Sequence, residues 1–344
     1  MTRTYATSPS ADHALALVTA LQQRFVTGLE ALSCEGKQQT FNAVEWLREG
    51  GQFGGGERYE SADGALFGRG SVNVSQIHYD DIPEKKLASA TALSTIIHPQ
   101  HPLAPSVHIH LSWTEMKDGH GYWRLMADLN PSNPIEADKT AFLAALKTAA
   151  PEQYDSALAQ GDGYFEIPVL KRHRGVAHFY LENHNSGDAT ADLALAMRVG
   201  EAAIDGYLAI LKPHFEHPMP ASTEQKAAQL AYHSLYFFQV LTLDRGTTTG
   251  LLIHNQNDVG IMGSLPAYVD RQLLSSWLSR MTSPQDELLT GLIDVLPATK
   301  ASLVDEAIKE KLAEVVRGHY KNHPEAIAMQ AAGAVIPATV KNHG

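Results

Sequence analysis

The distribution of strand-like segments constrains the fold of this chain more than any other sequence feature. Segments in which apolar and polar residues alternate, as they do in half-buried β-strands, are concentrated between residues 65 and 129. They cover 65–67, 71–79, 95–97, 107–113 and 122–129, and later strand-like segments cover 175–181, 236–243, 248–253 and 259–264. The short connection Gly68-Arg69-Gly70 is typical of a turn between the first two segments.

Helical periodicity occurs between and after these clusters. It covers residues 13–32, 136–149, 152–160, 191–211 and 301–320. A regular alternation of strand and helix would predict a parallel sheet, whereas grouped strands and grouped helices predict an α+β fold. We therefore expect a large, mainly antiparallel sheet flanked by helices.

The composition is that of a packed globular protein. Hydrophobic residues make up 44% and charged residues 19% of the 344 residues. No internal repeat and no linker rich in proline or serine divides the chain. We expect one domain over residues 1–297, with residues 298–344 as a helical extension packed on it.

Charge and cysteine content exclude several classes of function. The formal net charge is −11 and no basic segment of useful length is present, so nucleic-acid binding is not expected. The single cysteine, Cys34, rules out an internal disulfide and a multi-cysteine metal site, and it fits a reducing compartment such as the cytoplasm. The segment Met1–Ser10 is polar, unlike a signal peptide, and no apolar run is long enough for a membrane span.

Known catalytic motifs give little guidance. The glycine-rich segment 50–56 is followed by Glu57 and Arg58 rather than by Gly-Lys-Ser/Thr, so it is a poor match to a phosphate-binding loop. A nucleophile elbow, an HExxH motif and a dinucleotide fingerprint are not found.

Histidines are concentrated around the fourth strand-like segment. His108, His110 and Ser112 share one face of that segment because side chains alternate along a strand, and Val107, Ile109 and Leu111 point the other way. Two histidines in this arrangement can converge on a metal ion if a third ligand is available. The simpler interpretation is a polar strand face in contact with solvent. His98 and His108 are the candidate metal ligands.

Three further segments carry charges that could act in a site. Asp128 precedes Asn130-Pro131, which is also typical of a turn at the end of a strand. The basic cluster Lys171–Arg174 could bind a carboxylate, or it could be an exposed loop. Asp244 and Arg245 could form a hairpin turn with a local ion pair.

Six segments, in order, resemble motifs of the oxygen-dependent coproporphyrinogen III oxidases. They are GGGERYESADGALFGRGSVNVSQIH, STIIHPQHPLAPSVHIH, YWRLMADLNP, HRGVAHFYLE, YFFQVLTLDRGTTTGL and VGIMGSLPAYV. Together they span residues 54–269, and their shared order and spacing identify the chain as a member of that family.

The resemblance implies a fold, an activity and a set of site residues. The family folds as a large antiparallel sheet flanked by helices and forms a homodimer through the region that corresponds to 236–268. Its members convert two propionates of coproporphyrinogen III into vinyl groups to give protoporphyrinogen IX, with molecular oxygen as oxidant and no organic cofactor, while a divalent metal stays possible. By position, Asp128 would bind the pyrrole N–H groups as an acid or base of raised basicity, and Arg174 would pair with a propionate. His108 would donate a proton and Ser94 would contact the substrate.

The chain departs from the family's motifs at the expected substrate site. Ser112 stands where an arginine is expected, and Asn255-Gln256-Asn257 replaces a segment with a second arginine. We therefore take His110, Ser112, Asn255 and Asn257, with Ser94, as candidate substrate-binding residues. Arg124-Leu125-Met126 replaces three glycines, and His178 replaces another. A desolvated propionate without its arginine would cost about 2–5 kcal/mol. Arg124, His110, His178 and Lys171 add positive or titratable groups nearby.

Three hypotheses follow from the sequence. The chain could oxidise coproporphyrinogen III in haem biosynthesis. It could instead be a divergent member of the family that binds another tetrapyrrole or a small acid. It could also be a metal protein that uses His98, His108 and His110.

Overall fold

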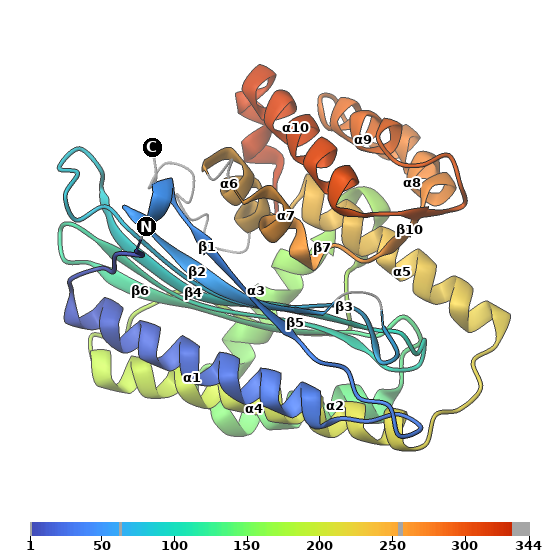
Figure 1. Ribbon diagram of the computed structural model, residues 1–344, viewed down its shortest axis with the longest axis horizontal. Coiled ribbons are helices and arrows are strands. Elements are labelled where there is room, and N and C mark those ends of the chain that lie inside the picture. The colour runs from blue at the N-terminus through green and yellow to red at the C-terminus, as the bar shows by residue number, and fades with distance from the viewer. Residues whose placement is uncertain (1, 62–63, 254–256, 332–344) are drawn as a thin grey trace.

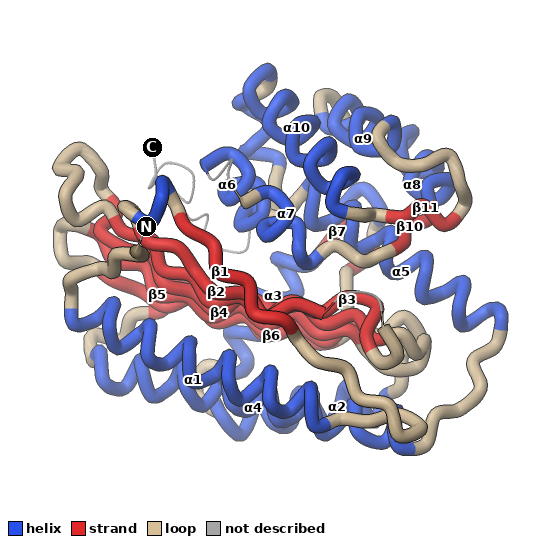
Figure 2. Tube along the Cα trace, in the orientation of Figure 1, coloured by secondary structure: helices blue, strands red, loops and turns tan. Residues whose placement is uncertain are grey.

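A seven-stranded antiparallel sheet forms the middle layer of the protein (Figure 2). A computed structural model describes residues 2–61, 64–253 and 257–331. The strands follow one another across the sheet in the order β1 (Asn42–Leu47), β2 (Gly54–Ser61), β3 (Phe67–His78), β4 (Leu87–Pro99), β5 (Ser106–Met116), β6 (Gly121–Asn130) and β9 (Ala177–His184). The predicted α+β class and the mainly antiparallel sheet are confirmed.

Helices cover both faces of this sheet (Figure 1). On one face lie α1 (Pro9–Ala31), α2 (Glu136–Ala149) and α4 (Ala189–Glu216), and α3 (Tyr154–Phe165) packs against β9. The other face is covered by α5 (Thr223–Thr242), α6 (Arg245–Ile253), α7 (Asp258–Ile261), α8 (Arg271–Trp277), α9 (Gln285–Asp294) and α10 (Glu306–Asn322). Short strands complete the fold: β7 (Glu166–Ile167) with β8 (Arg172–His173), and β10 (Tyr268–Asp270) with β11 (Ala301–Leu303).

The alternation of β5 is as the sequence predicts. Val107, Ile109 and Leu111 are fully buried in the hydrophobic core between the sheet and α1 and α4. His108 and His110 lie on the opposite face, toward α5 and α6. One strand therefore supplies both the core and a row of polar side chains, because its side chains alternate.

Gly68-Arg69-Gly70 is not a turn, contrary to the sequence-based prediction. It lies within β3, which pairs continuously with β2 and has one register shift against β4 between Phe67 and Arg69. A Cβ atom on Gly70 would be 2.6 Å from the ring of Phe41, so the glycine allows a close approach between strand and aromatic ring.

The predicted strands at 236–243, 248–253 and 259–264 are wrong, since these residues are helical in α5, α6, α7 and a 3₁₀ turn. All residues from Ser234 to Thr242 in α5 are buried, which removes the polar face that marks a surface helix. Ser222 and Gln225 form a capping box at the start of this helix.

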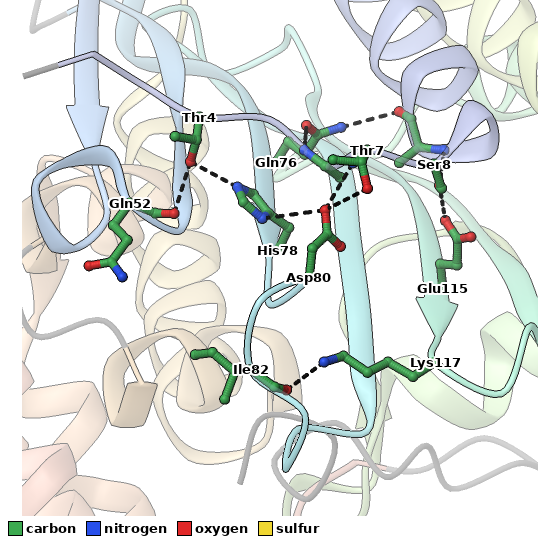
Figure 3. Close-up of polar contacts among 12 residues, drawn as sticks. Thr4, Thr7, Ser8, Gln52, Gln76, His78, Asp80, Ile82, Glu115 and Lys117 are labelled. Carbon is green, nitrogen blue, oxygen red and sulfur yellow. Dashed lines mark hydrogen bonds and ion pairs between the residues drawn. The ribbon is translucent and has the colours of Figure 1, made fainter.

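Polar contacts of the N-terminal segment tie it to one end of the sheet (Figure 3). Thr4 Oγ1 lies 2.9 Å from His78 Nε2, and Thr7 N donates to Asp80 Oδ2 at 2.9 Å. Ser8 caps α1 and also hydrogen-bonds Glu115 of β5. These contacts fix where α1 begins against β3 and β5.

The C-terminal part is helical but begins with a strand. The predicted helix 301–320 is β11 followed by α10, which packs on α6, α7 and α9. Leu312, Val316 and Tyr320 enter the second hydrophobic core, which is formed mainly by α5, α8, α9 and α10. Within the described ranges, no helix combines the length and apolar character needed to cross a bilayer.

Candidate active site

A cavity of about 220 Å³ lies between the polar face of the sheet and the helices α3, α5, α6 and α7. A second cavity of about 240 Å³ adjoins it. The two share the lining residues Asn73, His110, Arg124, Gly246, Gly250, Gly260 and Ile261. The two cavities therefore form one site with two lobes, of which the first is the cavity of about 220 Å³ and the second that of about 240 Å³.

Asp128 is the centre of the polar network at the wall of the first lobe. Its side chain is completely buried on β6. Oδ1 lies 2.7 Å from His108 Nδ1, and Oδ2 accepts from Arg174 Nη2 at 2.7 Å and from Asn130 Nδ2 at 2.6 Å. Sheet register explains part of this arrangement, because His108 of β5 is the direct cross-strand partner of Asp128.

The electrostatics of Asp128 correct one expectation. Burial acts to raise the pKa of this carboxyl group, but Arg174 and His108 outweigh burial and hold the pKa at about 2. The raised basicity expected for Asp128 from the sequence is therefore wrong, because its pKa lies below the usual value rather than above it. A carboxylate this stable serves better as a fixed negative charge than as a base.

His108 connects Asp128 to the first lobe, which it lines together with Ser94 of β4. Because its Nδ1 faces Asp128, Nε2 is the nitrogen that is left for a ligand. The arrangement matches the general pattern in which a buried carboxylate orients an imidazole and fixes its tautomer.

Arg174 is ion-paired with Asp128 and also lines the first lobe. Its guanidinium stacks between the rings of Phe165 (4.6 Å) and Tyr236 (4.9 Å). Nε is buried without a hydrogen-bond partner among the described residues. The other members of the basic cluster, Lys171–His173, are exposed, so only Arg174 reaches the site.

Gly175 holds the backbone next to Arg174 in a conformation that favours glycine, with φ of +79°. A Cβ atom here would lie 2.7 Å from Asn130 Oδ1 and 2.8 Å from the carbonyl oxygen of Leu129. We expect Gly175→Ala to lower the free energy of unfolding by about 1–3 kcal/mol. It should also weaken activity, because Asn130 and Arg174 both contact Asp128.

Chemical denaturation of the variant would measure this change, with Gly187→Ala as the matched control. Gly187 also has a positive φ, of +87°, but a Cβ atom there would meet nothing within 4 Å. Equal losses of stability in the two variants would show that backbone strain alone acts at Gly175.

Arg124 and Glu182 form a second ion pair, which was not predicted from the sequence. Arg124 Nε donates to both carboxylate oxygens of Glu182, at 3.0 and 3.1 Å, and Nη2 donates at 3.1 Å. His110 and Ser112 lie beside this pair, with 3.1 Å between Nε2 and Oγ. Burial, followed by the charges of Arg124 and His108, lowers the pKa of His110 to about 3, so this histidine is neutral at physiological pH.

The remaining predicted residues have mixed positions. Asn257 lines the second lobe, and Asn255 lies outside the described residues.

Asp244 lines the first lobe, where it accepts a hydrogen bond from Tyr164 Oη at 2.8 Å. The predicted hairpin with an ion pair between Asp244 and Arg245 is not formed. Asp244 instead precedes α6 and accepts a hydrogen bond from the backbone N–H of Thr247. Arg245 Nε donates to the carbonyl oxygen of Ala331. Tyr164 had no recognisable sequence signal.

The metal hypothesis finds no matching geometry in the described ranges. His98 Nδ1 lies 2.9 Å from Ser106 Oγ and Nε2 lies 3.1 Å from the carbonyl oxygen of Ser264, so both ring nitrogens have partners. In the part of the chain that the structure describes, no group of three or more His, Cys, Asp or Glu side chains is arranged to hold a metal ion.

Comparison with known proteins agrees with the fold. A sequence model of the coproporphyrinogen III oxidase family matches residues 13–293. The oxygen-dependent coproporphyrinogen-III oxidase of Rickettsia akari is 30% identical over 248 residues, which are 68% of this chain and 86% of the relative. The protein of the same name from Prochlorococcus marinus is 26% identical over 334 residues, 86% of this chain and 93% of the relative. This chain belongs to the coproporphyrinogen III oxidase family.

Proposed function

We propose that the protein catalyses the oxidative decarboxylation of coproporphyrinogen III to protoporphyrinogen IX, a step of haem biosynthesis, with molecular oxygen as co-substrate. The observation that carries this proposal is the hydrogen-bonded group of Asp128, His108 and Arg174 at the wall of a cavity. The names of the relatives supply the reaction.

The reaction balances without an organic cofactor. Each propionate loses its carboxyl carbon as carbon dioxide, and the two remaining carbons become a vinyl group. Besides carbon dioxide, two protons and two electrons leave per propionate, which is what one dioxygen needs to become hydrogen peroxide. The protein must therefore hold the pyrrole, accept a proton and keep the reacting propionate in place.

The three residues divide these tasks. Asp128 provides a fixed negative charge behind the cavity wall, which holds Arg174 and orients His108. We assign the proton transfer to His108 Nε2, because the carboxylate of Asp128 is too stable to serve as the base. Arg174 Nε lacks a partner among the described residues and can donate to a propionate without releasing Asp128.

The size of the site supports a ligand that occupies both lobes. Pockets for small molecules commonly measure about 300–1,000 Å³, whereas the lobes measure about 220 and 240 Å³. A macrocycle would need both of them, and Ser94, His110, Ser112 and Asn257 would then all lie along its path.

Anaerobic mixing with coproporphyrinogen III, followed by exposure to oxygen, tests the reaction. We expect protoporphyrinogen, measured after oxidation as protoporphyrin, and two carbon dioxide molecules per substrate. Intact substrate, under conditions in which an established oxidase converts it, would rule the proposal out.

We further propose that the protein works as a cytoplasmic homodimer, as the family resemblance implies. The part of the expected interface, 236–268, that belongs to α5 is buried inside the subunit. Tyr268 and its cross-strand partner Leu303 are exposed, at 41% and 40%, and could meet a second copy. Sedimentation would then show a dimer that Tyr268→Lys weakens and that Met219→Lys, at another exposed residue, leaves intact.

A further inference from the structure

The second lobe contains one charged side chain among the described residues that line it, and that side chain is Arg124. The rest of the lining is apolar or neutral, because His110 is kept uncharged. No acidic residue lines this lobe in the described part of the chain. An anion that enters it would therefore meet one guanidinium and no repelling carboxylate at the wall.

Among the described residues, the guanidinium of Arg124 uses only part of its hydrogen-bond donors. The hydrogen bonds to Glu182 use Nε–H and one N–H of Nη2. An arginine has five N–H donors in a planar fork, and the remaining three belong to Nη1 and the outer side of Nη2. Glu182 is almost fully buried and Arg124 is 16% exposed, so the carboxylate fixes the guanidinium from behind while Arg124 itself faces the cavity.

Arg124 and Asp128 lie on the same strand, and an ion pair holds each of the two side chains in place. They are four residues apart on β6 and share the face that lines the site, since Met126 between them also lines the first lobe. At a rise of 3.2–3.4 Å per residue, their Cα atoms are about 13 Å apart. A small acid cannot span this separation, whereas a macrocycle with carboxylate arms on opposite edges can place one arm at Arg174, the partner of Asp128, and another at Arg124.

We propose that Arg124, held by Glu182, is a carboxylate-binding residue that takes a propionate on the edge of the tetrapyrrole remote from Asp128. This inference rests on the proposed function for the class of ligand. It gives the second lobe a specific role, which is to distinguish a tetrapyrrole with acid groups on opposite edges from smaller acids. Ser112, 3.1 Å from His110, lies opposite Arg124 in the sheet and can supply a hydroxyl to the same carboxylate.

Binding of coproporphyrin III, the stable oxidised form of the macrocycle, tests this assignment. Its tetraamide has the same shape without negative charges. Trp46 lines the second lobe, so quenching of tryptophan fluorescence can report occupancy. Removing Arg124 alone would leave Glu182 as an unpaired buried charge. The test variant is therefore the double substitution Arg124→Gln with Glu182→Gln, and the control is Glu182→Gln alone, which keeps the guanidinium.

We expect the double variant to bind coproporphyrin III about 10- to 100-fold more weakly than the wild type does. The control should bind it within a few-fold of the wild type, and all three proteins should bind the tetraamide equally. Unchanged affinity for the tetra-acid in the double variant would overturn the assignment. An equal loss for both ligands would show a purely structural role, and a wild type that does not bind the tetra-acid would also overturn it. A wild type that binds through Arg124 but does not convert coproporphyrinogen would refute only the reaction.

Discussion

Asp128→Asn is expected to lower kcat/KM for coproporphyrinogen oxidation by about 10²–10⁴-fold. The amide keeps the shape of the carboxylate but removes the charge that pairs with Arg174 and orients His108. One of its ends is an NH₂ group, which would face a donor on Arg174 or His108. Steady-state turnover, with product measured as protoporphyrin, gives the size of the effect.

Two comparisons separate chemistry from folding in this experiment. Asparagine is preferred to alanine because its amide oxygen can still accept a hydrogen bond from Arg174, whereas alanine would leave the buried guanidinium with no acceptor at this position, at a cost of about 3–5 kcal/mol in stability. Asp155→Asn, at an exposed position of α3, is the matched control and should retain full activity. A fully active Asp128→Asn protein would show that the carboxylate has no part in the reaction.

Acidification from pH 7 to pH 5 is expected to remove several kcal/mol from the free energy of unfolding. Burial lowers the pKa of His110 to about 3 and that of His233 to about 4, and it lowers the pKa of His98 as well. Each histidine stays neutral in the folded protein but takes up a proton when unfolded, below about pH 6.5. Stability is therefore lost as the pH falls from 6.5 toward the folded pKa, by roughly 2 kcal/mol each for His110 and His233 at pH 5.

Urea denaturation at a series of pH values would measure this dependence. His110→Gln should reduce the loss of unfolding free energy between pH 7 and pH 5 by roughly 2 kcal/mol, the contribution of that residue. His13→Gln, at an exposed position of α1, should leave the pH dependence unchanged. Since a domain of ordinary stability has about 5–15 kcal/mol in total, the expected loss is large. A free energy of unfolding that changes by less than 1 kcal/mol over this range would contradict the assignment of neutral buried histidines.

The part of the fold that follows strict periodicity could be predicted from the sequence. The segments 107–113 and 136–149 match β5 and α2 because one face of each is buried and the other is not. The same reasoning failed for 236–243, where burial on all sides erased the pattern and the aromatic and β-branched residues suggested a strand. It also failed at Gly70, where a glycine that makes room for Phe41 looks like a turn residue.

The site was predictable only as far as motifs and strand faces allow. The common face of His108 and His110 followed from alternation, and Asp128 and Arg174 followed from the family motifs. The ion pair of Arg124 with Glu182 could not be found, because it joins β6 to β9 over 58 residues of sequence. The low pKa of Asp128 was also out of reach, since it depends on how close Arg174 comes in space.

The two faces of β5 have a consequence for how this protein can change. Val107, Ile109 and Leu111 hold the core, while the residues between them line the site, so each set can be altered without touching the other. A library randomised at 108, 110 and 112 would vary ligand preference on a scaffold that still folds. Ligand preference and architecture therefore depend on different residues of the same strand.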